Sequence, residues 1–297
     1  MNSVVATISN SLIDEIVSAV GLPKTHFTHT IFGRIFFKIR NRLATIAATF
    51  DQMTKERGLP AASAWVLTHF CDGYHIHGAE HIPAHGPLLV ASNHPGTYDS
   101  LVLFANLQGH KIRIVSSEIP ALRLLPYAKR HFLVTPKDDV HERMLVLRKL
   151  IRHLQNGGTV VYFAAGHREP DPTVYPGSEG SIDHWLNVFD NFYKLAKGLQ
   201  VLPTIVSGMI SADWVKHPIT WLRHKQIDKQ RLAEFGQVIT QLRHPGKLMM
   251  TPRVFFGDHF SEQDLRETAG IGSLFPTVIT RVKALWRESK AYFGDFL

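Results

Sequence analysis

The sequence has little cysteine and no long apolar run, and both absences limit what the protein can be. The single cysteine, Cys71, excludes an intramolecular disulfide and is compatible with a reducing compartment. No stretch of about 18 uncharged apolar residues occurs, so we expect no transmembrane helix. Asp14 and Glu15 interrupt the first apolar residues, so the N-terminus does not resemble a secretory signal. These features favour a cytoplasmic protein.

Apolar residues and positive charge are what the sequence has in quantity. With 297 residues and 44% hydrophobic composition, the chain can form one large α/β domain with a buried core, or such a domain with a helical appendage. The 33 lysines and arginines exceed the 25 aspartates and glutamates by 8, and 18 histidines add to them below neutral pH. This balance favours an anionic partner, which would be a phosphate-bearing substrate, an anionic membrane or a nucleic acid.

Two helices are expected before residue 70, one over residues 3–20 and one from about 28 to 57, where Gly58 and Pro60 follow. An apolar stripe runs along the second helix and consists of Phe32, Phe36, Ile39, Leu43, Ile46 and Phe50. Basic residues flank this stripe, namely Arg34, Lys38 and Arg42, with Arg40 on the other side. Two interpretations stay open: the stripe lies in a membrane interface, or it packs on the rest of the protein.

From about residue 71 the pattern alternates between strands and helices. Strands are predicted at residues 74–78, 87–92, 111–116, 131–135, 159–163, 199–206 and 247–256. Helices are predicted at residues 99–108, 120–130, 139–156, 183–196 and 226–243, with two more near the C-terminus. This alternation predicts an α/β fold with a layered, largely parallel mixed sheet flanked by helices. We expect an N-terminal helical segment (1–70), a main domain (71–260) and a C-terminal helical extension (261–297).

One strand-to-helix turn carries the clearest chemical pattern. The apolar strand that ends at Ser92 is followed by Asn-His-Pro-Gly, and a helix begins near Asp99. In α/β proteins such a turn lies at the carboxyl edge of the sheet, where ligands bind. The spacing lets Asp99 accept a hydrogen bond from one nitrogen of His94 while the other nitrogen faces a substrate. The turn offers no obvious serine or cysteine nucleophile, so a hydroxyl of the substrate would be the nucleophile.

A second loop follows another apolar strand in the same way. It contains the candidate ligand-binding residues Phe163, Gly166, His167 and Arg168. The guanidinium of Arg168 has a shape that suits a phosphate. The segment over residues 164–181 is long and rich in glycine and proline, which is typical of functional loops. A surface turn with a solvated arginine is the alternative interpretation.

Together the two loops resemble the glycerol-3-phosphate and 1-acylglycerol-3-phosphate acyltransferases, a phospholipid-synthesising family. Its hallmark is Asn-His, four further residues and Asp, which Asn93, His94 and Asp99 match fully. The resemblance covers roughly residues 74–210. It implies that His94 removes a proton from the acceptor hydroxyl, that Asp99 orients the imidazole, and that an acyl-CoA or acyl carrier protein donates the acyl group. It implies neither a cofactor nor a metal.

The resemblance also implies substrate-binding residues in both loops. They are Asn93, Gly96 and Thr97 in the first loop and Phe163, Gly166, His167 and Arg168 in the second. Backbone amides of the turn over residues 95–97 are candidate oxyanion donors. The family's third motif, Phe-Pro-Glu-Gly-Thr-Arg, departs here because Ala165 stands for the glutamate. This departure implies a different acceptor, a replacement by Glu169, or lost activity.

Two further family motifs are matched less closely. The second motif ends in an arginine after an apolar strand, and here Pro136 follows the strand and Lys137 is the nearest cation. The stretch Val201–Thr204 resembles the fourth motif, in which Pro203 would line the pocket.

Three other chemistries have weaker support. His75 and His77 lie on one face of a predicted strand, as metal ligands can, but no established metal-binding pattern accompanies them. Cys71 follows an apolar helix, which favours a buried thiol over a nucleophile. The net charge suits a nucleic acid, but no recognised binding module is present, so no nucleic-acid partner is expected.

The sequence thus predicts an O-acyltransferase of glycerolipid metabolism, associated peripherally with an anionic membrane on its cytoplasmic face. Its partners would be acyl-CoA or acyl carrier protein and a glycerolipid or other alcohol acceptor. The alternative is a catalytically silent lipid-binding or membrane-associated protein that retains the fold.

Overall fold

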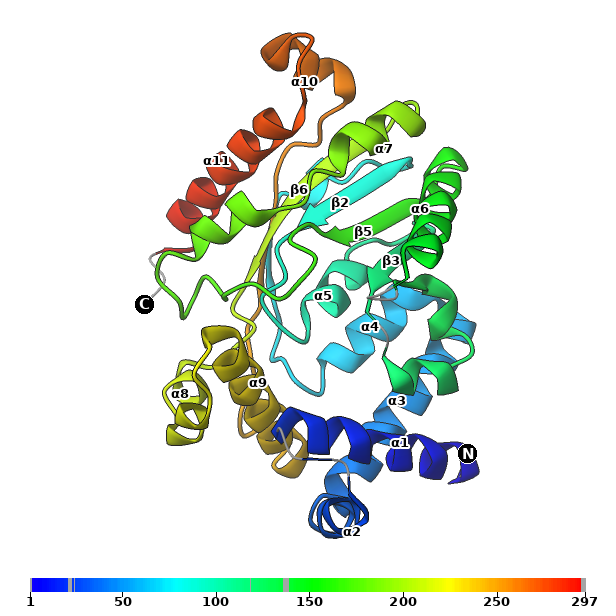
Figure 1. Ribbon diagram of the computed structural model, residues 1–297, viewed down its shortest axis with the longest axis vertical. Helices are drawn as coiled ribbons and strands as arrows, with labels where there is room; N and C mark the ends of the chain where they lie inside the picture. Colours follow the sequence, from blue (N-terminus) through cyan, green and yellow to red (C-terminus); the bar gives the residue numbers. More distant parts are fainter. Residues whose placement is uncertain (1, 21–22, 24, 118, 136–138, 295–297) are drawn as a thin grey trace.

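A seven-stranded mixed sheet forms the centre of the molecule (Figure 1). The computed structural model describes residues 2–20, 23, 25–117, 119–135 and 139–294. The strands lie in the order β1 (His75–His77), β7 (Arg253–Phe256), β6 (Gln200–Ser207), β2 (Leu88–Ser92), β5 (Thr159–Phe163), β3 (Ile112–Ser116) and β4 (Phe132–Val134). Neighbouring strands are parallel except β6 and β7, which are antiparallel. The predicted fold class, a largely parallel mixed sheet flanked by helices, is confirmed.

The position of β2 in this sheet decides where the two loops meet. All five of its residues are buried, as expected for an uninterrupted apolar run in a parallel sheet covered on both faces. It pairs with β5 on one side and β6 on the other, so that Ser92 lies opposite both Phe163 and Thr204. The carboxyl ends of these three strands therefore meet at one edge of the sheet, and the loops that follow them are neighbours.

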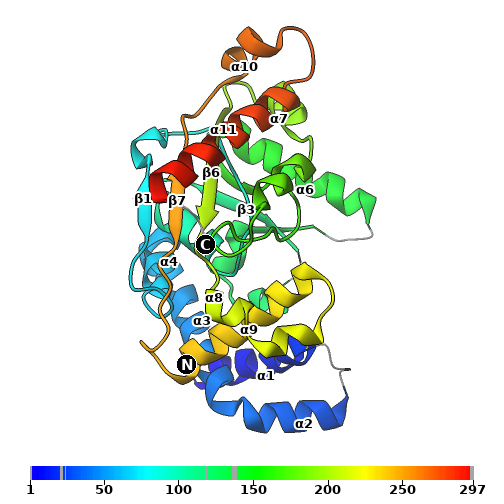
Figure 2. The same cartoon turned by 90° about the vertical axis from the view of Figure 1, so that its left-hand side faces the viewer.

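Helices cover both faces of the sheet and form two hydrophobic cores with it. The first core includes residues of α1 (Asn2–Val20), α3 (Phe37–Arg57), α4 (Leu59–Leu67), α5 (Asp99–Ala105) and α9 (Gln226–Arg243). The second includes residues of α6 (Val140–Gln155), α7 (Phe189–Leu195), α10 (Glu262–Ala269) and α11 (Phe275–Phe293). Alternate residues of β2 join them, Leu88 and Val90 the first and Leu89 and Ala91 the second. Figure 2 shows α1, α2 (His26–Ile35) and α9 at one end of the molecule and α10 at the other.

The single helix predicted over residues 28–57 is wrong, because this segment forms two helices. The chain leaves the helical conformation at Phe36, between α2 and α3. The predicted end at Arg57 is confirmed, with Gly58 as the C-cap of α3, but α4 begins directly at Leu59 with Pro60 in its first turn. The first turn of a helix tolerates proline, since the missing N–H would have no partner there. The proline is a start signal for α4 and not only a stop signal for α3.

The apolar stripe is correspondingly divided between two environments. On α3, Ile46 and Phe50 are buried, and Ile39 and Leu43 pack against the first core. The second interpretation, packing on the rest of the protein, therefore holds for this half of the stripe. By contrast, no described residue of α2 is buried. No helix in the described part of the chain is long and apolar enough to cross a membrane.

Three more expected elements differ in extent. The helix expected over residues 120–130 is two short 3-10 segments, Pro120–Leu124 and Ala128–His131, because Pro126 lacks an N–H and disfavours a helical conformation at the residue before it. The helix expected over residues 183–196 is the 3-10 segment Ser178–His184 followed by α7. The strand expected from residue 247 begins at Arg253. The two C-terminal helices are confirmed as α10 and α11.

Truncating Phe50 tests whether this half of the stripe is covered by protein. Phe50 is 8% exposed, so Phe50→Ala should leave a cavity and lower the free energy of unfolding by about 3–5 kcal/mol. Phe37 is 52% exposed, so the matched control Phe37→Ala should cost less than about 1 kcal/mol. Urea unfolding measures both changes. A Phe50→Ala variant as stable as Phe37→Ala would contradict the packing of α3.

Candidate active site

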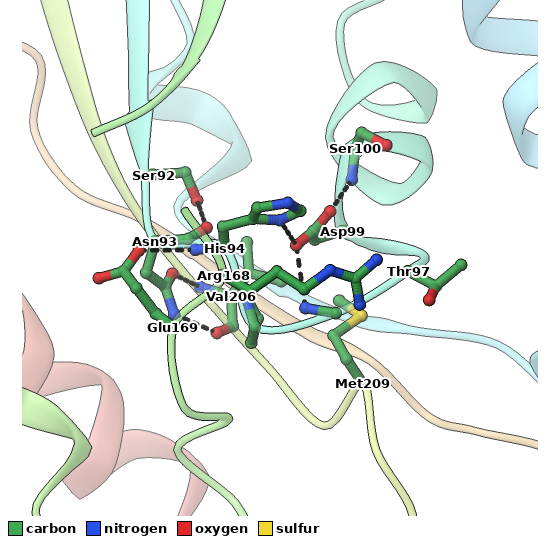
Figure 3. Close-up of polar contacts among 12 residues, drawn as sticks. Ser92, Asn93, His94, Thr97, Asp99, Ser100, Arg168, Glu169, Val206 and Met209 are labelled. Carbon is green, nitrogen blue, oxygen red and sulfur yellow. Dashed lines mark hydrogen bonds and ion pairs between the residues drawn. The ribbon is translucent and has the colours of Figure 1, made fainter. Parts of the chain in front are cut away.

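His94 and Asp99 form the hydrogen bond that their spacing predicts (Figure 3). The Nδ1 of His94 lies 2.6 Å from the Oδ2 of Asp99, which is the first residue of α5 and is 1% exposed. Asp99 also accepts hydrogen bonds from the backbone N–H groups of Gly96 (3.1 Å) and Ser100 (2.6 Å). These donors and the N-terminal end of α5 stabilise its negative charge. The carboxylate is therefore suited to hold Nδ1 in its protonated form.

The rest of the imidazole faces an aromatic ring and solvent. The ring of His94 stacks on that of Phe163, with centroids 4.2 Å apart and an interplanar angle of 12°. The side chain keeps 25% of its surface exposed, and its Nε2 has no hydrogen-bond partner among the described residues. Because Nδ1 donates to Asp99, the neutral ring carries its lone pair on Nε2. The arrangement leaves a base open to a ligand.

Glu169 fixes the backbone of His94 from the second loop. Its Oε2 accepts the N–H of His94 (2.9 Å), and its own N–H donates to the carbonyl of His94 (2.8 Å). Its Oε1 accepts the indole N–H of Trp185 (3.0 Å). Burial raises the pKa of this carboxyl, and the hydrogen bonds oppose that rise. Both carboxylate oxygens of Glu169 accept hydrogen bonds inside the protein. Glu169 therefore positions the backbone of His94 and does not take the place of the family's acceptor-binding glutamate.

Asn93 joins β2 to β6 from inside the protein. Its side-chain NH2 donates to the carbonyl of Val206 (2.8 Å), and its side-chain oxygen accepts the N–H of Val206 (2.7 Å). Asn93 is fully buried. The sequence predicts Asn93 as a substrate-binding residue. In the structure, its side chain instead binds the backbone of β6 and does not reach a ligand-accessible surface.

The turn after His94 rests on a segment held by a second buried carboxylate, Asp171. This residue accepts hydrogen bonds from the N–H groups of Gly208 (3.0 Å), Met209 (2.5 Å) and Ile210 (3.1 Å). Burial raises the pKa of Asp171, and hydrogen bonds from Thr173, Gly208 and Met209 oppose the rise. Gly96 packs against Met209 so closely that a Cβ at this position would lie 2.6 Å from the Cβ of Met209. Gly96 therefore allows a close backbone approach, and its N–H is already donated to Asp99.

Arg168 points across the first loop and is paired with a residue that the sequence reasoning missed. Its side chain extends toward Asp99 and Thr97 (Figure 3). It forms an ion pair with Glu234 of α9, whose Oε2 also accepts the hydroxyl hydrogen of Thr97 (2.8 Å). Burial lowers the pKa of the Arg168 guanidinium. No sequence signal singles out Glu234, because it lies on a helix without a motif and 137 residues from Thr97.

The remaining predicted residues lie in different places. Gly166 has a φ of 71°, a conformation that favours glycine, and turns the second loop. His167 is exposed, and its Nδ1 donates to the carbonyl of Arg168 (2.9 Å). Pro203 is buried within β6, where its ring lies beside Gly257 on the face covered by α11, so the structure does not bring it to His94. Lys137 and Pro136 lie outside the described residues.

The surroundings of the histidines considered as metal ligands, and of the Cys71 thiol, do not suit metal binding or nucleophilic chemistry. Among the described residues, no group of three or more histidine, cysteine, aspartate and glutamate side chains could hold a metal ion. The ring of His77 instead stacks on that of Phe255, with centroids 4.4 Å apart, and lies tilted against that of Tyr292, with centroids 4.1 Å apart. Cys71 is buried, and desolvation raises the pKa of its thiol to about 12. A thiolate nucleophile at this position is therefore disfavoured at neutral pH.

Residues 73–207 match the family model described as Acyltransferase. A search among curated proteins found no match. Among solved structures, the chain is similar to the crystal structure of the 1-acyl-sn-glycerophosphate (LPA) acyltransferase PlsC from Thermotoga maritima, with 16% identity, 97% of each chain covered and a TM-score of 0.43. The residues of both loops lie inside the matched range, whereas Glu234 lies outside it.

Substituting Gly96 tests the close contact between the first loop and Met209. Gly96→Ala should lower the free energy of unfolding by about 1–3 kcal/mol, because the new methyl group meets a Cβ that cannot rotate away. Gly180→Ala is the matched control, since no atom lies within 4 Å of a Cβ built there. Urea unfolding of both variants measures the difference. Equal stability of the two would show that the loop has room that the structure does not contain.

Proposed function

We propose that the chain is an acyltransferase of the family whose model matches residues 73–207, and that it moves a fatty acyl group from an acyl thioester to a hydroxyl of a glycerolipid-type alcohol. The acyl donor in this proposal is acyl-CoA or an acyl carrier protein. The acceptor is glycerol-3-phosphate, a lysophospholipid or a related alcohol. The observation that carries the proposal is the His94–Asp99 pair, with Nδ1 held by the carboxylate and Nε2 open.

In the proposed reaction, Nε2 of His94 takes the proton of the acceptor hydroxyl as its oxygen attacks the thioester carbonyl. The imidazolium that forms is stabilised by Asp99, which lies 2.6 Å away and is itself held by two backbone donors. When the tetrahedral intermediate collapses, the carbon–sulfur bond breaks and the thiolate takes the proton from Nε2. The products are an ester and a free thiol, and the base is regenerated.

Substituting His94 should distinguish the proposed enzyme from the alternative, a catalytically silent lipid-binding protein. His94→Ala should lower the rate of acceptor-dependent thiol release by about 100- to 10,000-fold, and Asp99→Asn should also lower it, because the tautomer of His94 is no longer fixed. Exposed His141 of α6 provides the matched control, and His141→Ala should change the rate far less. Thiol release from acyl-CoA with a panel of alcohols is the measurement. Turnover that survives His94→Ala, or no turnover on any acceptor, would sink the enzyme proposal.

We further propose that the protein reaches its acceptor at an anionic membrane surface through α2 and the start of α3. Phe27, Ile35 and Phe37 are 72, 66 and 52% exposed, and Arg34 and Lys38 are exposed beside them. Apolar rings and aliphatic groups next to cations are the composition of an interfacial anchor. Arg42 is used differently, because its guanidinium donates to the carbonyl of Leu242 on α9 (3.3 Å).

Charge reversal at the junction of α2 and α3 tests this anchor. The double variant Arg34→Glu and Lys38→Glu should weaken co-sedimentation with anionic vesicles on the order of tenfold or more, because each cation near such a surface contributes about 1 kcal/mol. Lys194→Glu with Lys197→Glu gives the same change of charge on exposed residues elsewhere and should have a much smaller effect. Binding that is unaffected by the first pair would rule out this region as the electrostatic anchor.

A further inference from the structure

Two buried side-chain oxygens beside the first loop lack hydrogen-bond partners. They are Oε1 of Gln230 and Oε1 of Glu234, on residues that are 0 and 4% exposed. Their four-residue separation places them on the same face of α9, one turn apart. Buried acceptors without donors are rare in folded proteins because each one costs free energy. Two of them at one site indicate that a ligand supplies O–H or N–H donors.

Gln230 holds this part of α9 against both loops. Its side-chain NH2 donates to the carbonyl of Pro95 (2.7 Å) and to the carbonyl of Glu169 (2.9 Å). Two carbonyl acceptors fix which end of the amide carries the hydrogens, so its oxygen must point elsewhere. The same contacts keep Glu234, one turn further along, next to the residues that surround His94.

Glu234 changes the charge of the region that the sequence marks as an anion site. Its carboxylate is 4% exposed and is paired with Arg168, the cation that would otherwise meet a phosphate. Asp99 also contributes negative charge close to the guanidinium. A phosphate placed at Arg168 would therefore meet two carboxylates, and like charges in contact at a poorly solvated site are strongly unfavourable. The positive charge of Arg168 is already matched within the protein.

We propose that Gln230 and Glu234 select an acceptor whose group next to the reacting hydroxyl is an uncharged or cationic hydrogen-bond donor, and that they reject a phosphomonoester there. Hydroxyl and ammonium groups share the required chemistry. Both oxygens are shielded in the structure, so a donor group would reach them only if the partly exposed Arg168 side chain moved aside. This inference rests on the proposed acyl transfer and narrows its acceptor class.

The test compares two acceptors that differ only in the phosphate, 1-acylglycerol and 1-acylglycerol-3-phosphate, in matched mixed micelles with acyl-CoA. We expect wild-type kcat/KM to favour 1-acylglycerol by about tenfold or more. Glu234→Gln removes the negative charge and keeps the shape, so it should shift the ratio toward the phosphate acceptor by about tenfold, mainly through KM. Glu234→Asp keeps the charge and should retain the wild-type preference. An amino-alcohol analogue of 1-acylglycerol distinguishes an ammonium donor from a hydroxyl donor.

Asp228→Asn is the matched control. It makes the same change of charge on the same helix, at a side chain that is 40% exposed and paired with Arg231, and should leave the ratio unchanged. If the wild-type protein prefers 1-acylglycerol-3-phosphate, the inference is wrong but the proposed acyl transfer stands. This result needs only the wild-type protein, so it holds even if Glu234→Gln does not fold. A ratio that Glu234→Gln does not alter also overturns it.

The inference can be tested separately if the proposed acyl transfer does not occur. If the wild-type protein acylates no acceptor, calorimetric binding of the same two lipids to wild type and Glu234→Gln decides the inference. Tighter binding of 1-acylglycerol to wild type, with the preference reduced in Glu234→Gln, supports the selection by α9. Tighter binding of the phosphate lipid to wild type contradicts it.

Discussion

The site depends on one constraint, the burial of β2 between β5 and β6 at the centre of the sheet. This placement aligns Ser92, Phe163 and Thr204 and puts the two following loops within hydrogen-bond reach of each other. The reciprocal bonds between Glu169 and the backbone of His94 then lock the loops together. A shift of β2 against either neighbour would separate His94 from the aromatic ring that stacks on it and from the carboxylate that holds its backbone.

Buried carboxylates perform most of the positioning, and each has a different set of donors. Asp99 binds the imidazole, Glu169 binds the backbone of the same residue, and Asp171 binds three successive N–H groups under the turn. Charged groups are stable in such places only when donors surround them. Glu234 differs from the other three because one of its oxygens is left without a donor. That difference is why we propose that Glu234 recognises a ligand, whereas the other three carboxylates support the fold.

Local patterns in the sequence were sufficient for the features that depend on neighbouring residues. The apolar run of β2, the alternation of strands and helices, and the His94–Asp99 hydrogen bond all follow from spacing over a few positions. Local patterns could not separate protein from lipid as the cover of the stripe on α3, because both are apolar. They also misjudged Pro60, whose position suits the start of a helix as well as the end of the preceding one.

The features that sequence reasoning missed join residues far apart in the chain. Asn93 meets Val206 across 113 positions, and Thr97 meets Glu234 across 137. Family motifs identify Asn93 and Arg168 as important without saying what they touch. In the structure, Asn93 binds the buried backbone of Val206. Arg168 is paired with Glu234 of α9, a helix that lies beyond the range matched by the family model. The contacts that join the two loops to α9 are therefore the part of the site that a motif describes least.

The proposed chemistry requires that Asp99 fixes His94 with its proton on Nδ1 and its lone pair on Nε2. Nitrogen-15 NMR of the labelled imidazole, assigned by comparison with His94→Ala, reads this tautomer directly in the resting protein. We expect Nδ1 to be the protonated nitrogen of the neutral ring and Asp99→Asn to disturb this preference. A neutral ring protonated on Nε2 in the wild-type protein would contradict it, because no base would then face the acceptor.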